Sequence, residues 1–144
     1  MPTRAVIEVL RGRPCVTAKM DATARSVAHL MKDNHTSAVL VVEKGALVGI
    51  CTERDLVIKV VAADRNPART RVGDIMTPHP QTIAPDHPFG HALHLMYEGG
   101  FRHVPVVAAD GRPLGVLAAR DALTLDALEF EQELVRREEI TVIL

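Results

Sequence analysis

The sequence predicts an α/β fold made of two β-α-β-β-α repeats that pack together with pseudo-twofold symmetry. Residues 17–42 align without a gap on residues 82–107, about 65 positions further along the chain. With one extra residue in the second copy, residues 49–55 then align on residues 115–121. In both copies the hydrophobic period switches between strand-like and helix-like stretches in the same order. Two copies of one unit are expected to leave clefts between them, which are natural ligand sites.

Length and composition indicate a soluble globular protein. A chain of 144 residues fits one compact domain, so the copies are expected to be halves of one unit. With 47% apolar residues, 24% charged residues and a net charge of −1, nothing favours nucleic acid as the main partner. The absence of a long apolar run predicts no membrane association and a cytoplasmic location. Cys15 and Cys51 lack zinc-binding or disulfide-scaffold spacing and are expected to be reduced, structural thiols.

The first helix of each repeat is predicted from an apolar face. In the first repeat, residues 21–23 offer an N-cap, and apolar residues recur at helical spacing over 27–31. In the second repeat Pro88 marks the start, because proline is tolerated in the first helical turn, and the apolar face recurs over 92–96.

Two strands are expected to follow each of these helices. Residues 38–42 and 104–107 are apolar runs rich in β-branched residues, which are typical of strands covered on both faces. Short turns containing a glycine lead from them into strands over 47–51 and 114–117. Each repeat therefore contains a predicted hairpin.

The second helices are predicted over 52 to about 63 and over about 119–137. The first of them ends at a polar linker, residues 64–67, which separates the repeats. We therefore expect a first repeat over 1–66 and a second over 67–128.

The C-terminal segment, residues 129–144, has no counterpart in the first repeat. It continues the last helix through a charged stretch and ends in a strand-like apolar run over 140–144. An exposed run of this kind is expected to pack on its own domain or on a second subunit, which predicts a homodimer contact.

An aspartate at the start of each second helix suggests ribose recognition. The two oxygens of a carboxylate can accept hydrogen bonds from both vicinal hydroxyls of a ribose, and Asp55 and Asp121 occupy this place. A helix N-terminus also attracts phosphate, and Thr52 adds a hydroxyl donor there. Cations for phosphate oxygens are available nearby: Arg54, Arg120, Arg102 and His103.

A purely structural role for the same residues stays open. Thr52 and Asp55 have the spacing of a capping box, in which hydroxyl and carboxylate satisfy the first N–H groups of a helix. Asp121 is present although Ala118 has removed the hydroxyl of the second copy, which a reciprocal cap would not require. Capping and ligand binding can also coexist.

Catalysis and metal binding are not predicted. No nucleophile with a supporting base and no glycine-rich phosphate loop is recognisable, so the protein is not expected to be an enzyme. Five of the seven histidines fall between His79 and His103, with His91 and His94 one turn apart. No cysteine or carboxylate completes a ligand set with them, so no metal site is predicted.

The repeats resemble paired cystathionine-β-synthase (CBS) domains, also called a Bateman module. The resemblance covers residues 6–128 and is carried by Gly49-x-x-Thr52-x-x-Asp55, Gly115-x-x-Ala118-x-x-Asp121, Asp74-Ile75-Met76-Thr77 and Arg102-His103-Val104-Pro105-Val106-Val107. It implies a CBS-domain pair that binds adenosine-containing ligands in the clefts between the repeats: AMP, ADP or ATP first, S-adenosylmethionine or NAD second. It implies no obligatory cofactor and frequent face-to-face dimers.

The resemblance also implies two sites, each shared between the repeats. The first combines Thr52, Arg54, Asp55, Thr82, Phe101, Arg102 and His103. The second combines Arg120, Asp121, Thr17, Thr36 and Ser37. Ala118 stands where the family usually has a phosphate-contacting serine or threonine. A lost donor to a charged group weakens binding by about one to two orders of magnitude, so the second site is expected to be weaker or empty.

We therefore expect a regulatory module that senses an adenine nucleotide and signals to a protein partner that the sequence does not identify. The alternative is a ligand-independent interaction or scaffold protein that acts through its dimer surface and C-terminal segment.

Overall fold

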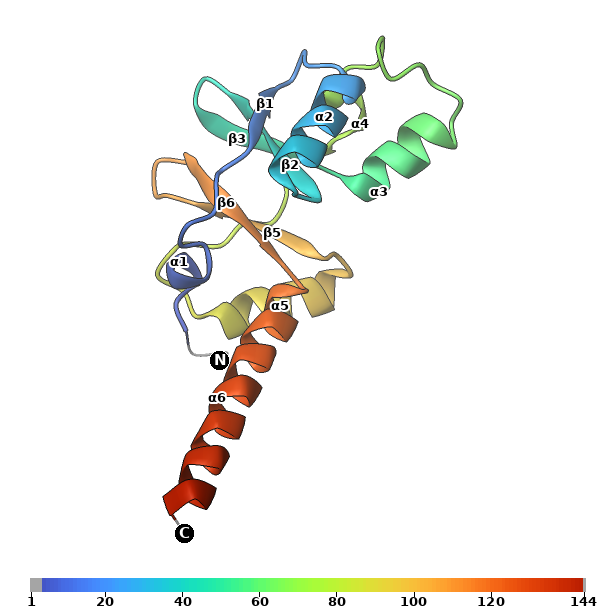
Figure 1. The fold of residues 1–144 in the computed structure, drawn as a ribbon. Helices are drawn as coiled ribbons and strands as arrows, with labels where there is room; N and C mark the ends of the chain where they lie inside the picture. The colour runs from blue at the N-terminus through green and yellow to red at the C-terminus, as the bar shows by residue number, and fades with distance from the viewer. Residues whose placement is uncertain (1–3, 144) are drawn as a thin grey trace.

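The computed structural model describes residues 4–143 and shows two α/β repeats followed by a long C-terminal helix (Figure 1). Its elements in chain order are α1 (Val6–Val9), β1 (Thr17–Lys19), α2 (Ala24–Asn34), β2 (Ala38–Glu43), β3 (Ala46–Thr52), α3 (Glu53–Leu56), the π-helix η1 (Val57–Val61), α4 (Val72–Ile75), β4 (Thr77–Pro78), α5 (Phe89–Gly99), β5 (His103–Val107), β6 (Pro113–Ala118) and α6 (Asp121–Ile143). The predicted α/β class and the repeated order of helices and hairpins are confirmed.

Each repeat forms its own small sheet. In the first, β1 runs parallel to β2, and β3 pairs antiparallel with both β2 and β4. In the second, β5 and β6 form an antiparallel hairpin, and the expected first strand is reduced to a single parallel bridge between Ile83 and Val106. The ladder would continue through the N–H groups of residues 85 and 105, and because both are prolines with no N–H to donate, the pairing stops there.

The second helices differ from their predicted form. After Thr52, a single α-helical turn changes into η1, and the helix ends near residue 62. The predicted strand-like run over 140–144 is wrong for its described part, because α6 continues as one helix to Ile143, while Leu144 lies outside the described residues. A strand requires a neighbouring strand, and α6 extends away from both sheets (Figure 1). The strong helix formers over 129–139 therefore carry the helix onward.

The two hydrophobic cores are completed by exchanged segments. Helix α1 lies at the start of the first repeat in the chain, yet Val6 and Val9 are buried in the core of the second repeat. Helix α4 lies at the start of the second repeat, yet Val72 and Ile75 are buried in the core of the first. Each core therefore takes one helix from across the division that the sequence analysis expects at residue 66.

A third apolar cluster joins the repeats. Leu40 and Ile50 of the first sheet are buried together, and Val116 from β6 packs against them. Two equivalent glycines show the pseudo-symmetry of the repeats. The Met76 side chain packs against Gly49, and the Leu10 side chain packs against Gly115. A side chain at either glycine would press on the segment exchanged from the other side of the division.

The two cysteines lie in different surroundings. Cys51 is fully buried, and burial, followed by the nearby Asp55 carboxylate, raises the pKa of its thiol to about 12. Cys15 is exposed, and partial burial of its thiol raises its pKa. Both are free thiols, as expected from their spacing. Between residues 4 and 143, no helix is both long enough and apolar enough to cross a bilayer.

The exchanged helix α4 is expected to contribute strongly to stability. Ile75→Ala removes a side chain that is 1% exposed in the core of the first repeat, so it should lower the free energy of unfolding by about 2–5 kcal/mol. Ile58→Ala is the matched control, because Ile58 is 53% exposed, and should cost much less. Urea unfolding followed by circular dichroism measures both. Equal losses would contradict the assignment of α4 to this core.

Candidate functional site

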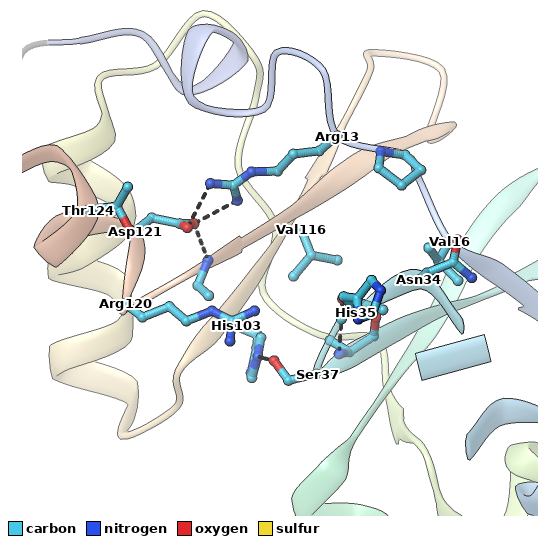
Figure 2. A pocket seen from close by; sticks show the side chains of 14 residues that line it. Arg13, Val16, Asn34, His35, Ser37, His103, Val116, Arg120, Asp121 and Thr124 are labelled. Atoms are coloured by element: carbon cyan, nitrogen blue, oxygen red, sulfur yellow. Dashed lines mark hydrogen bonds and ion pairs between the residues drawn. The ribbon is translucent and has the colours of Figure 1, made fainter. Parts of the chain in front are cut away.

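Two cavities lie between the repeats, on either side of the apolar joint. The first cleft, of about 1370 Å³, lies between the start of α3 and the loop before β5. The second cleft, of about 340 Å³, lies between the start of α6 and the loop before β2, and Figure 2 shows its side chains. Each cleft therefore combines a helix start from one repeat with a loop from the other, the arrangement that the resemblance to paired CBS domains implies.

The first cleft gathers most of the residues predicted for it. The lining includes Thr52, Arg54, Asp55, Phe101, Arg102 and His103. Thr82 does not line the cleft and is exposed beside the Ile83 bridge.

Asp55 both caps its helix and faces the first cleft. It is 8% exposed, and its Oδ2 accepts a hydrogen bond from the Thr52 main-chain N–H at 2.9 Å. Its Oδ1 lies 3.0 Å from the Lys59 ammonium, which also donates to the Ile75 carbonyl at 2.9 Å. The main-chain part of the capping interpretation is therefore confirmed. Lys59 was missed in the sequence, although a cation four residues after an acid is a recognised helical pair.

The loop before β5 is shaped by a glycine pair. A Cβ at Gly99 would collide with the Phe101 ring, so the absence of a side chain lets this half-buried ring pack back against the second core. Gly100 ends α5 in the left-handed region with φ 72°. His35 ends α2 in the same conformation with φ 51°, so the two repeats turn into their central strands in the same way.

The first cleft has an excess of positive charge. Among the described residues that line it, the lysine and arginine side chains are Arg54, Lys59, Arg102 and Arg120, and the acidic ones are Glu53 and Asp55. His79 adds an imidazole that sequence analysis did not assign to the site. Such an excess favours an anionic ligand.

The second cleft contains four of its five predicted residues: Thr36, Ser37, Arg120 and Asp121. Thr17 does not line it and is exposed at the start of β1. The Thr36 hydroxyl donates to the Ala38 carbonyl at 3.1 Å. His35 also lines the cleft, at the helix end just before this loop.

Asp121 is held by an arginine that the sequence analysis did not identify (Figure 2). Arg13 Nη1 lies 3.0 Å from Oδ2, and Arg13 Nη2 lies 2.8 Å from Oδ1. Oδ2 also accepts the Ala118 main-chain N–H at 2.8 Å, the counterpart of the cap on Asp55. Arg13 and Asp121 are 108 positions apart in the chain, so no local spacing signals this pair.

A hydrogen bond separates the two clefts. Ser37 Oγ lies 2.8 Å from His103 Nε2, and both residues line both cavities, as Arg120 does. Sequence analysis assigned His103 to the first site and the other two residues to the second. Burial, followed by the Arg120 charge, lowers the pKa of His103, so its imidazole is neutral at pH 7.

The remaining histidines do not form a metal centre. No group of three or more histidine, cysteine or acidic side chains is gathered for a metal ion within the part of the chain that the structure describes. The rings of His87 and His91 lie 5.1 Å apart, and His94 Nε2 lies 3.1 Å from Glu98. His94 thus pairs along its own helix and does not converge with the clefts.

The chain is similar in sequence to a known domain family and to known proteins. The CBS domain model matches residues 6–62 and 72–127. An uncharacterised protein of Methanopyrus kandleri is 35% identical over 127 residues, which are 88% of this chain and 64% of the relative. Matches to plant CBS domain-containing proteins are shorter, and one of them, from Arabidopsis thaliana, is covered over 18% of its length. The chain thus spans less than two thirds of these relatives.

Two solved structures with the same fold contain adenosine compounds. The CBS domain protein PAE2072 from Pyrobaculum aerophilum, complexed with AMP, is 28% identical with a TM-score of 0.75, over 82% of this chain and 89% of that one. The CBS domain pair of protein MJ0100, in complex with 5′-methylthioadenosine and S-adenosylmethionine, is 26% identical with a TM-score of 0.79, over 89% and 99%. Two matches to the domain model and these likenesses place the chain in the CBS domain family, as a CBS domain pair.

Proposed function

We propose that this chain is a regulatory module that binds an adenosine-containing ligand in the first cleft, without catalysing a reaction. The observation that carries the proposal is the Asp55 carboxylate at the start of α3, which lines a large cleft rich in cations. The complexes of similar proteins with AMP and with S-adenosylmethionine support this ligand class. The protein would act in the cytoplasm without an obligatory cofactor.

The charge of the first cleft favours AMP, ADP or ATP over other adenosine compounds. Four lysine and arginine side chains face two acidic ones among the described lining residues, so a ligand with phosphate groups would balance the excess. S-adenosylmethionine carries a sulfonium cation and would add to this excess. NAD carries two phosphates and is a secondary candidate.

The ribose would bind to Asp55. A carboxylate has about four lone-pair positions. Asp55 accepts hydrogen bonds from the Thr52 N–H, from Lys59 and, at a longer 3.4 Å, from the Thr52 hydroxyl, which leaves capacity for a ribose hydroxyl. In the second cleft, Arg13 bonds to both oxygens of Asp121 in addition to the Ala118 cap. We therefore propose that the first cleft is the stronger site, for this reason as well as for the missing hydroxyl at Ala118.

Ligand binding in a cleft would be converted into a signal through the apolar contact between the two repeats. A ligand shifts a conformational equilibrium only by its difference in affinity between the two states. Because each cleft contains groups from both repeats, a ligand that contacts both would favour one relative arrangement of the two sheets. A protein partner or a second copy of the chain would read this arrangement.

The long helix α6 supports a second candidate function, an interaction role through a homodimer. Exposed apolar side chains lie along one stripe of α6: Leu123, Phe130 and Leu134, with Ala127 between them. Their spacing of three and four residues is that of a coiled-coil seam, which fits a second copy of the same helix. Asp126, Glu131 and Glu133 flank the stripe, so the association is expected to strengthen as salt screens their repulsion.

Asp55→Asn should weaken nucleotide binding. The substitution keeps one oxygen for the cap but removes the charge and one ribose acceptor, so the Kd for AMP or ATP should rise by about 10- to 100-fold. Isothermal titration of nucleotide-free protein measures the Kd. Asp64→Asn is the matched control, because Asp64 is exposed and asparagine tolerates its φ of 56°.

No binding of AMP, ADP, ATP, NAD or S-adenosylmethionine to folded wild-type protein would overturn the sensor proposal. Binding that Asp55→Asn and Asp64→Asn weaken equally would remove Asp55 from the site.

Phe130→Glu should abolish the dimer. Phe130 is 60% exposed in the middle of the stripe, and a buried unpaired carboxylate there would oppose association. Light scattering coupled to size exclusion, in low and high salt, measures the mass. Gln132→Glu on another face of α6 is the matched control and should leave the mass unchanged. A monomeric wild-type protein in both salts would contradict the interaction role of α6.

A further inference from the structure

We propose that Arg13 sets the ligand specificity of the second cleft. Its ion pair with Asp121 opposes the binding of ligands that offer only a ribose. A ligand that also brings an anionic group gives the Arg13 guanidinium another partner, so the carboxylate becomes available to the ribose. The inference rests on the proposed function, because it concerns which adenosine compounds the second cleft accepts.

The ion pair is bidentate and lies inside the cavity (Figure 2). Both guanidinium nitrogens of Arg13 contact the carboxylate, at 3.0 and 2.8 Å, and the Asp121 side chain is only 6% exposed. With the Ala118 N–H at 2.8 Å, three donors are bonded to the two oxygens. Because one guanidinium bonds to both oxygens of Asp121, a ribose that uses both oxygens has to displace Arg13.

The first cleft is neutralised differently. The cation on Asp55 is Lys59, which comes from the same helical segment and bonds to one oxygen. The residue 66 positions after Lys59 is Leu125, which is buried in the second core and carries no charge. The cation for Asp121 comes instead from the segment between α1 and β1. Both cations line their cavities, but Lys59 contacts one oxygen of Asp55, whereas Arg13 contacts both oxygens of Asp121 and so competes with a ligand for the whole carboxylate.

The charge on Arg13 decides which ligand can break the ion pair. A guanidinium stays protonated at any physiological pH. A neutral ligand that displaces Arg13 from Asp121 therefore leaves the guanidinium without an anionic partner and the carboxylate without a cationic one. A phosphate brought into the same cavity offers the guanidinium a second bidentate partner, and Arg120 lines the same wall. The Arg13 side chain is 40% exposed, so it can turn without disturbing a core. An anionic ligand thus exchanges one ion pair for another.

The test is made in an Asp55→Asn background, which weakens the first cleft, and the part of the remaining binding that a further Asp121→Asn substitution removes is assigned to the second cleft. Adenosine and AMP are titrated calorimetrically into this parent and into the same protein carrying Arg13→Gln, Arg13→Lys or Arg11→Gln. Arg11→Gln is the matched control, an exposed arginine two residues away. Thermal unfolding confirms that each variant is folded, and Arg13→Lys keeps the test usable if the loss of charge in Arg13→Gln prevents folding.

The expected result is a crossover of preference. The parent binds AMP more tightly than adenosine by at least about tenfold, because only AMP re-pairs the guanidinium. Arg13→Gln tightens adenosine binding by about tenfold and weakens AMP binding, which removes the preference. Arg13→Lys shifts both affinities in the same directions by a smaller factor, since one of the two hydrogen bonds is lost. Arg11→Gln leaves both unchanged.

The failures of the two proposals are distinguishable. If wild-type protein binds AMP through Asp55 but Arg13→Gln and Arg13→Lys leave adenosine and AMP binding in the parent unchanged, the role of Arg13 is overturned and the proposed function stands. If wild-type protein binds none of AMP, ADP, ATP, NAD and S-adenosylmethionine but Arg13→Gln binds adenosine, the role of Arg13 stands and the sensor proposal fails. If no variant binds adenosine or AMP, the role of Arg13 is overturned, and the sensor proposal fails with it when the wild-type protein also binds none of the other three ligands.

Discussion

The apolar joint formed by Leu40, Ile50 and Val116 is the constraint on which the rest of this structure depends. It holds β2 and β3 of the first repeat against β6 of the second. Because the clefts lie on either side of it, the joint determines how far each aspartate lies from the loop of the other repeat. The exchanged helices α1 and α4 reinforce it, since each core is incomplete without a segment from across the division. Neither repeat would retain its complete core without the other.

Pseudo-symmetry places the same main-chain hydrogen bond in both sites, but side chains make the sites unequal. Asp55 and Asp121 each accept an N–H from the residue three positions earlier, so both carboxylates are oriented by their own helix start. The cations differ: Lys59 belongs to the same helical segment as its aspartate, whereas Arg13 reaches its aspartate from a separate loop. A duplicated fold can therefore present two clefts with different requirements for a ligand.

The Ser37–His103 contact connects these two environments. One imidazole and one hydroxyl, 2.8 Å apart, line both cavities, so a ligand in either cleft meets the same pair. Burial and the Arg120 charge lower the pKa of His103, which keeps the imidazole neutral and leaves the positive charge of the clefts to lysine and arginine. The wall between the clefts is polar, thin and contributed by both repeats.

The sequence by itself determined the repeat, the α/β class, the order of elements and the two aspartates, because period, turn residues and helix starts are local signals. The resemblance to paired CBS domains named twelve site residues, of which ten line a cleft in the structure, whereas Thr17 and Thr82 lie outside. Only the tertiary structure decided the exchange of α1 and α4, the helical end of α6 and the Arg13–Asp121 pair. These three features depend on which segments come into contact in the folded chain. A contact between residues 108 positions apart produces no periodic pattern in the sequence.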